Sequence, residues 1–511
     1  MDPSPTGTMP QTTSERRPAH WNYLPPEIRT MILKEICNIN GCKLAGPVTV
    51  SREWQAVLEP RNFSRIMLTP ARLRDLESMV HRNRSHMRYL WFSFELQRYN
   101  CDECDGNLDQ LLLTYEDNKA ITTSLEDLFL ALSKFDPTSE LILDISVHSP
   151  SDSEHWFKEL TFGPDDDSLG ELGIHRAAKQ LATHQGDPID HEWSITKPGG
   201  DEIMKLFQDV MGEGPFGTDE EEYQWWQQLP AVPAVTFIIL RQQNRRRWKP
   251  NALPYIFALF PRLHEIAYEP WREWDRVMQG WTDNWYRLLF ESLARSSELK
   301  RITLFENFDE RYSPRCDDCD PIRIPALSVS EAIAKASLKL EHLSASFIAD
   351  ASHFFDVACK PSFKWTNLTS LVLTSQSLTP DEDLVTIYAL LQTATAASNM
   401  PQIRTMEIWN GCRGLAGLFR YQLTERHRPA VVTWRGTCSL TLPPQLRQVW
   451  EAVTLKHGGS GCCYIEELLN VQVKCHGDAV FYLQLAKPVL RPTSLQQIRA
   501  EHRFKEEAWI R

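Results

Sequence analysis

The sequence lacks several features that would assign it to a class of protein at once. No apolar run approaches the ~18 residues of a membrane-spanning helix, and residues 1–20 are polar, without the apolar core of a secretory signal. Cysteine is scarce, with 12 in 511 residues, which argues against a disulfide scaffold and favours reduced thiols. The net charge of −12 argues against non-specific nucleic-acid binding. We expect a cytoplasmic or nuclear protein that binds neither nucleic acid nor membranes.

The composition that is present supports folding over most of the length. Hydrophobic residues make up 42% and charged residues 24% of the chain, so a core can be buried. At roughly 100–200 residues per domain, the length allows several domains, or one small domain and a long repeat array. We expect residues 1–20 to form a disordered tail.

The next segment, residues 21–68, predicts two or three short helices. Pro25 and Pro26 stand where the first helix would begin, a position at which the missing N–H costs nothing. Ile28, Met31 and Ile32 then follow the spacing of one helical face. So few short helices cannot bury a large core. A partner protein is therefore expected to cover their apolar side chains.

From residue 87 onward, an apolar-x-x-apolar-x-apolar unit recurs, with helical stretches between its copies. One of these stretches, Leu125 to Phe135, follows a Thr123-x-x-Glu126 capping pattern. This alternation predicts a mixed α/β fold, either an irregular leucine-rich-repeat-like solenoid or a generic α/β domain in which the spacing arises by chance. The clearest copies lie at residues 263–268, 299–304, 340–345, 368–373 and 403–408.

Domain boundaries follow from these patterns. Residues 69–441 are expected to form the repeat-like domain, interrupted at about 150–230 by a solvated acidic insertion that contains Asp165–Asp167 and Asp219–Glu222. Residues 442–511 are expected to form a C-terminal capping region, because the end of a repeat array needs a polar cover.

The N-terminal segment resembles an F-box. The family pattern of Leu-Pro-x-Glu, Ile-Leu, a Val and Trp four residues apart, and Pro before an aromatic residue is matched by Leu24-Pro25-x-Glu27, Ile32-Leu33, Val50 to Trp54, and Pro60 to Phe63. The sequence departs from the pattern at Ser51, where cysteine is usual, and in a longer loop at Gly41–Pro47. Together with the repeats, the segment looks like fungal F-box proteins with a leucine-rich-repeat-like C-terminal domain.

The resemblance implies a substrate-recognition subunit of an SCF-type cullin–RING ubiquitin ligase. Such a subunit is not an enzyme and needs no cofactor, because it acts by bringing a protein substrate close to the ligase. Its partners would be the ligase's adaptor subunit and an unknown protein substrate. The residues expected to bind the adaptor, some of which must instead hold the helices together, are Leu24, Pro25, Ile28, Ile32, Leu33, Val50, Trp54 and Val57.

The substrate surface is expected on the concave face of the repeat sheet, where side chains between the apolar positions would point outward. An ordinary solvated sheet face is the alternative. The Trp271, Trp274, Trp281 and Trp285 cluster is expected to pack against the solenoid rather than to bind a partner. The candidate substrate-binding residues are Arg241, Glu269, Thr303, Phe305, Ser344, Val372, Thr374, Glu407 and Trp409.

Other motifs predict no catalytic or metal site. Cys101-x-x-Cys104 and Cys316-x-x-Cys319 are too far apart along a solenoid for one zinc site to be the favoured interpretation. The basic run at 245–249 is expected to be a solvated loop, with a nuclear-import signal as the alternative, and residues 457–463 a glycine loop. The remaining functional alternative is a leucine-rich-repeat scaffold without ligase association.

Overall fold

The computed structural model describes residues 21–38, 44–76, 81–98, 113–154, 160–165, 207–212, 214–313, 319–360, 362–425 and 427–510. The chain divides into two compact units, Met1–Arg65 and Ile66–Arg511. The expected tail, residues 1–20, and most of the expected acidic insertion lie outside the described residues.

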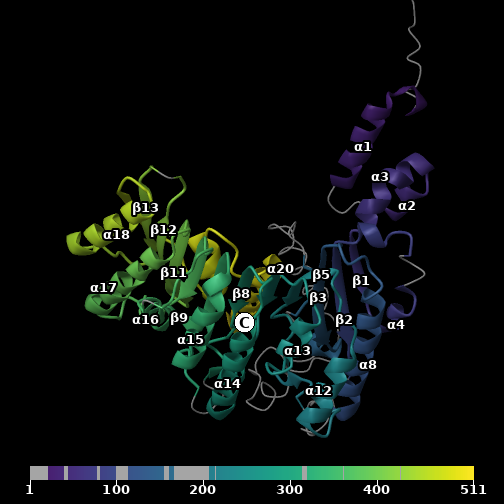
Figure 1. Ribbon diagram of the computed structural model, residues 1–511, viewed down its shortest axis with the longest axis horizontal. Helices are drawn as coiled ribbons and strands as arrows, with labels where there is room; N and C mark the ends of the chain where they lie inside the picture. The colour runs from purple at the N-terminus through teal and green to yellow at the C-terminus, as the bar shows by residue number, and fades with distance from the viewer. Residues whose placement is uncertain are drawn as a thin grey trace, which may run out of the picture. The chain divides into compact units, whose positions relative to one another are not determined.

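The first unit is built from short helices (Figure 1). After a 3-10 turn, η1 (Trp21–Tyr23), come α1 (Pro26–Asn38), α2 (Ala45–Val48) and α3 (Arg52–Asn62). The hydroxyl of Ser51, directly before α3, accepts a hydrogen bond from the Trp54 N–H at 3.3 Å, which satisfies one of the unpaired donors of the helix start. Helix α3 contains Pro60 in its last turn.

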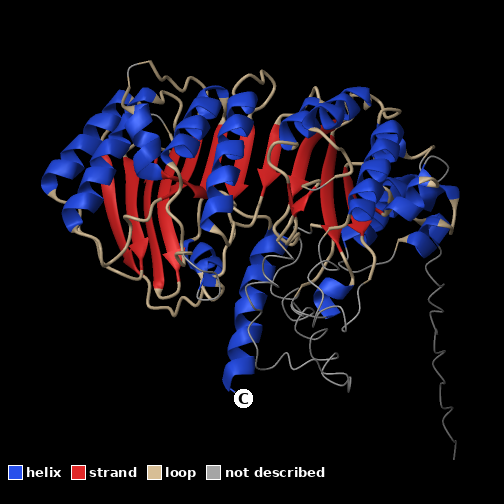
Figure 2. Ribbon diagram, turned by 90° about the horizontal axis from the view of Figure 1, so that it is seen from below, coloured by secondary structure: helices blue, strands red, loops and turns tan. Residues whose placement is uncertain are grey.

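A 12-stranded sheet dominates the second unit (Figure 2). The recorded pairings from β2 through β11 are parallel, and β12 runs antiparallel to both β11 and β13. The strands follow one another in chain order across the sheet, while β4 (Asp209–Val210) and β6 (Arg247–Trp248) form a separate pair. The sheet comprises β1 (Arg65–Leu68), β2 (Tyr89–Glu95), β3 (Leu141–His148), β5 (Val235–Leu240), β7 (Glu265–Tyr268), β8 (Arg301–Phe305), β9 (His342–Asp350), β10 (Ser370–Thr374), β11 (Thr405–Cys412), β12 (Leu415–Gln422), β13 (Ala430–Gly436) and β14 (Cys462–Leu468).

The repeated apolar positions of the sequence stand in register on neighbouring strands. Because side chains alternate between the two faces of a strand, each such row points to one face of the sheet. The best example is the buried row Ile266, Ile302, Leu343, Leu371 and Met406, in which each residue pairs with the next. The prediction of a mixed α/β fold is confirmed.

Helices cover the face to which this row points. From α13 to α18 each helix packs against its successor in the chain, as the ribbon shows (Figure 1). Helix α8 begins well before the predicted start at Leu125, with a capping box formed by Thr114 and Asp117, so Thr123 and Glu126 lie inside it. The helices are α4 (Pro70–Leu73), η2 (Arg84–His86), α8 (Tyr115–Leu132), α9 (Ser151–Glu154), α12 (Asp219–Gln228), α13 (Leu253–Ala258), α14 (Arg276–Leu293), α15 (Leu327–Ala336), η4 (Ser337–Lys339), α16 (Ala351–Ala358), α17 (Leu384–Thr393), η5 (Ala394–Asn399) and α18 (Pro444–Lys456).

The C-terminal region differs from the predicted cap. Strand β14 extends the same sheet, so residues 442–468 are part of the main fold. Helix α19 (His476–Leu483) then packs on β11 and β12, and α20 (Pro492–Ile510) packs on α19. We call residues 473–502 the C-terminal segment, and the sheet face on which it lies the inner face. This segment covers a face of the sheet, whereas the sequence predicted that it would cover an end.

Candidate interaction surfaces

The first unit keeps much of its apolar surface open. Ile28, Ile32 and Val50 are 41%, 37% and 62% exposed, and Met31 on the same helix is also exposed. Pro25 is exposed as well. Helices this short have few positions facing one another, so the apolar side chains on their other faces remain in water.

Other residues predicted to bind the adaptor hold the unit together. Leu33 is fully buried and belongs to the core. Trp54 is half-buried with its ring centroid 5.3 Å from that of Trp21, and Leu24 and Val57 are also half-buried. The predicted set therefore divides into open side chains and packed ones.

The residues predicted to bind a substrate do share one face of the sheet, the inner face. Trp409, for example, lies opposite Thr374, and Ser344 lies between Thr303 and Val372. The expectation that they face solvent is wrong. All are buried except Thr303, which is half-buried, and the buried set is Arg241, Glu269, Phe305, Ser344, Val372, Thr374, Glu407 and Trp409.

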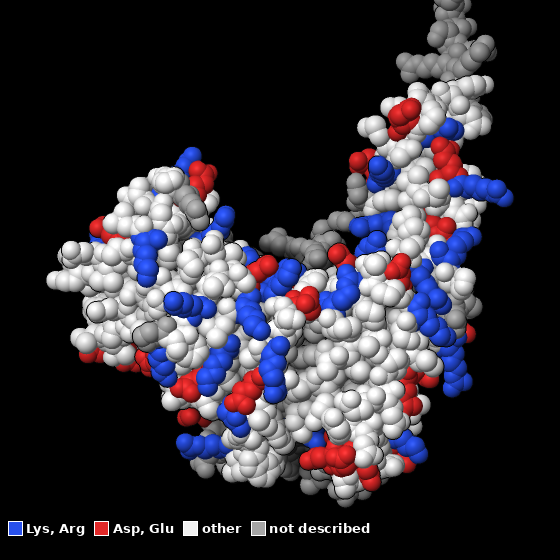
Figure 3. Space-filling view, in the orientation of Figure 1, with Lys and Arg blue, Asp and Glu red and all other residues white. Residues whose placement is uncertain are grey.

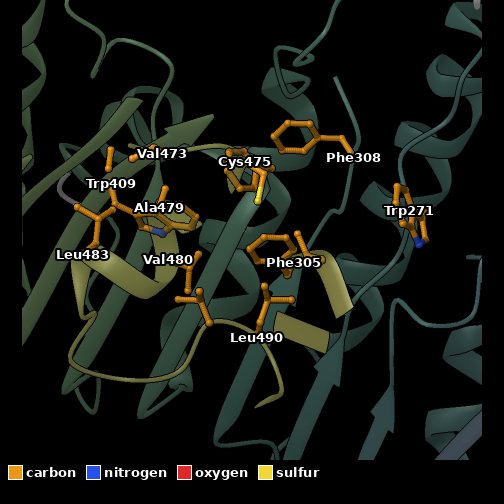
Figure 4. Packing of buried hydrophobic residues seen from close by; sticks show 14 of the residues in the cluster. Trp271, Phe305, Phe308, Trp409, Val473, Cys475, Ala479, Val480, Leu483 and Leu490 are labelled. Carbon is orange, nitrogen blue, oxygen red and sulfur yellow. The ribbon is translucent and has the colours of Figure 1, made fainter. Parts of the chain in front are cut away.

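The inner face is closed by the C-terminal segment of the same chain. Figure 4 shows Phe305 and Trp409 of the sheet directed toward Ala479, Val480 and Leu490 of the segment. Gly411 permits this close approach, because a Cβ there would lie only 2.3 Å from the Cβ of Ala479. Removal of apolar area on both sides provides the main driving force for closure.

Two buried carboxylates of the inner face bind the backbone of the C-terminal segment. Glu407 accepts hydrogen bonds from the Ala486 N–H at 3.0 and 3.1 Å, and Glu269 accepts one from the Arg491 N–H at 2.6 Å. Burial raises the pKa of both carboxyls, that of Glu269 to about 7, although the amide donors partly oppose the rise. The side chains that sequence reasoning assigned to a substrate are therefore occupied by the chain itself.

A further buried charge cluster connects the inner face to residues 163–165 of the expected acidic insertion and to Arg491 of the C-terminal segment. Arg241 pairs with Asp144 at 2.9 Å and donates to the Gly163 carbonyl at 2.8 Å. Asp165, expected in a solvated insertion, is buried and accepts from the Arg491 Nε at 2.6 Å. These polar groups satisfy one another, as buried charges must.

The basic run is not a solvated loop. Arg245, Arg246 and Arg247 are at most 5% exposed. Arg246 pairs with Asp152 at 2.5 Å, and Arg247 with Asp209 at 2.6 Å. The guanidinium of Arg245 lies 4.1 Å above the Trp271 ring and 3.0 Å from Glu501 of α20. Each arginine has a structural partner, so a nuclear-import signal would first require local unfolding.

The tryptophan cluster, like the first unit, contains both buried and exposed side chains. Trp271 and Trp274 are buried, as expected for packing. Trp281 is 56% exposed and Trp285 is half-buried on α14, so this part of the expectation is only partly met.

The remaining cysteine and histidine motifs are only partly covered by the described residues, and the covered part shows no catalytic arrangement. Cys101, Cys104 and Cys316 lie outside the described residues. The thiol of Cys319 donates a hydrogen bond to the Trp274 carbonyl at 3.0 Å. No group of His, Cys, Asp and Glu suited to a metal ion occurs in the described part of the chain. His457 is buried, with its Nδ1 3.2 Å from the Tyr421 hydroxyl. Among the described helices, none is long and apolar enough to cross a membrane.

Comparison with known proteins identifies a similarity within the second unit. A family of unknown function, DUF6546, matches residues 294–491. This range begins just after α14, contains β8 to β14 and α19, and ends at the residue whose N–H binds Glu269. No curated protein matches the chain.

Proposed function

We propose that the protein is the substrate-recognition subunit of an SCF-type cullin–RING ubiquitin ligase, in which residues 21–65 act as an F-box that docks on the adaptor. The observation that carries the proposal is the open apolar surface of Ile28, Met31, Ile32 and Val50 in a compact unit of its own. Covering such side chains contributes roughly 1 kcal/mol each, so several together support specific docking.

The second unit fits the receptor role as a leucine-rich-repeat-like solenoid. Support comes from the in-register row of Ile302, Leu343 and Leu371 and from the helices that pack neighbour to neighbour. Such an array supplies a long, rigid surface. The receptor itself performs no chemistry, because raising the local concentration of a substrate near the ligase is sufficient.

A second candidate function is a repeat scaffold without ligase association. The observation that favours it is the region between α1 and α3, where the described residues form only α2, a helix of four residues. In this case the open side chains of α1 would bind another protein.

Co-purification of the intact chain with the ligase adaptor tests the proposal. Ile32→Asp and Val50→Asp each place a charge on an open apolar position and should lower adaptor recovery at least about 10-fold. Leu384→Asp is the matched control, because Leu384 at the start of α17 is an aliphatic residue whose exposure, 50%, lies between those of Ile32 and Val50. This variant should bind normally. Failure of the wild type to recover the adaptor, or equal recovery by all variants, would favour the scaffold.

A further inference from the structure

A hollow of about 340 Å³ lies beside the sheet, between α4 and the C-terminal end of α8. Its apolar lining comprises Leu73, Leu76, Leu130 and Phe135. Leu130 is 56% exposed, which leaves an apolar wall of the hollow facing water.

The rim of this hollow is cationic in an otherwise acidic protein. Arg74, Arg84 and Lys134 line it against one carboxylate, Asp127, whereas the whole chain carries a net charge of −12. Arg84 also lies 5.8 Å from the centre of the Phe135 ring. An apolar floor with a cationic rim is complementary to an apolar side chain that is flanked by carboxylates.

The edge at which the parallel strands begin leads away from the hollow. Arg262 donates to the Ser139 carbonyl at 3.0 Å, which links the end of α8 to the start of β7. The Lys300 N–H then binds the His264 carbonyl at 2.9 Å, and the Arg404 N–H binds the Thr369 carbonyl at 2.8 Å. The strand starts thus form one continuous row.

The cations of this row are available to a partner. Lys300, Lys339, Lys364 and Arg404 are exposed, and within the described residues their side chains make no ion pair. The exposed carboxylates of the same edge are Asp136, Glu140, Glu298 and Glu341. Together with Asp127 of the rim they are fewer than the cations of the rim and the row combined. Lys and Arg groups also predominate over the centre of the face in Figure 3.

We propose that the hollow and this cationic edge bind an acidic segment of a partner protein, with an apolar side chain seated in the hollow. Because the C-terminal segment closes the inner face, a partner of the second unit must use an outer surface such as this edge. Three strand spacings of about 4.8 Å separate β3 from β8, so four to five extended residues span the strand starts between these two strands. The inference rests on the proposed function in one respect: the identification of the bound partner as the substrate of the ligase.

Selection from a phage-displayed library of random 12-residue peptides, with the intact chain as bait, tests the proposal without any ligase component. Recovered peptides should be enriched in Asp and Glu around one or two large apolar residues. The variant Arg74→Glu/Leu130→Asp should bind the best peptide at least about 10-fold more weakly in fluorescence polarisation. Both side chains are exposed, so an unchanged urea midpoint is expected to verify folding.

The matched control is Arg276→Glu/Leu384→Asp, which makes the same two changes at the starts of α14 and α17, beyond the opposite ends of the strands. It should bind like the wild type. Lys300→Glu/Lys364→Glu should weaken binding by about 3-fold and reduce its salt dependence. Recovery of basic or neutral peptides, equal binding by the hollow variant, or tighter binding of a (dT)12 oligonucleotide at the same salt would overturn the proposal, while loss of adaptor binding alone would leave it standing.

Discussion

The inner face of the sheet and the open apolar surface of the first unit were both predicted to bind partners, but they differ in the folded chain. Each carries large apolar side chains, which on the inner face stand among polar ones. On the inner face Phe305 and Trp409 are completely buried, whereas Ile28 and Val50 remain 41% and 62% exposed. The difference is that a later part of the same chain covers the sheet. A binding surface is therefore defined by what the chain leaves uncovered as well as by its pattern.

The largest expected effect comes from removing a side chain on the closed face. Trp409→Ala should lower the free energy of unfolding by about 3–5 kcal/mol, because it leaves a cavity among Phe305, Phe347 and the C-terminal segment. Urea denaturation followed by tryptophan fluorescence measures this. The matched variant Trp281→Ala, at a tryptophan that is 56% exposed, should change stability by less than about 0.5 kcal/mol. Similar losses for both would mean that the inner face is not closed in solution.

Gly411→Ala should loosen the closure directly. The new Cβ would lie 2.3 Å from that of Ala479, so α19 must move or the strand must bend, at a cost of about 3 kcal/mol. Hydrogen exchange should then increase in residues 476–490 more than in β8 to β10. The compensating double variant Gly411→Ala/Ala479→Gly should recover part of the loss, and no recovery would argue that the helix does not contact this strand.

Acid should weaken the closed face through His476. Burial lowers the pKa of His476 to about 3 in the folded chain, from an ordinary value near 6.5. The folded pKa is depressed, so the unfolded state binds more protons, and stability is lost as the pH falls below about 6.5. Between pH 7 and 5 this group alone should lower stability by about 2 kcal/mol.

The variant His476→Gln isolates that contribution. It keeps a donor toward the Asn307 side-chain oxygen, which lies 2.8 Å from His476 Nε2, but it does not titrate. Its stability should fall less between pH 7 and 5 than that of the wild type, although His342, whose pKa burial also lowers to about 3, still contributes. Parallel pH profiles for the two proteins would exclude the role of His476.

The strands could be predicted from the sequence because their signal is local. Apolar residues at fixed spacing identified β8 to β11, and alternation correctly placed Glu269, Val372 and Trp409 on one face. What covers that face depends on contacts between residues more than 60 positions apart, such as Glu407 with Ala486. One signal was available: Phe305, Val372 and Trp409 are apolar at positions assigned to solvent, which is typical of a covered face.

The prediction that the arginine run is a solvated loop was wrong for a related physical reason. Three adjacent cations usually mark a solvated loop, but each of Arg245, Arg246 and Arg247 meets an acid from another segment of the chain, among them Asp152 and Asp209. Charge pairing across long separations leaves no periodic trace in a single sequence. The exposure of the α1 side chains, by contrast, could be predicted from their local spacing and from the small size of the first unit.

The smallest expected effect on stability is at Val50, in the open apolar surface of the first unit. It tests most directly whether that surface differs from the closed inner face. Val50 precedes the N-cap Ser51 of α3, where a carboxylate is favourable toward the helix dipole. Val50→Asp should therefore change the free energy of unfolding by less than about 0.5 kcal/mol in urea denaturation, although the same substitution is expected to lower adaptor recovery at least about 10-fold. A stability loss above about 2 kcal/mol would show that Val50 is packed in the folded chain, and loss of docking by this variant would then report misfolding rather than a lost contact.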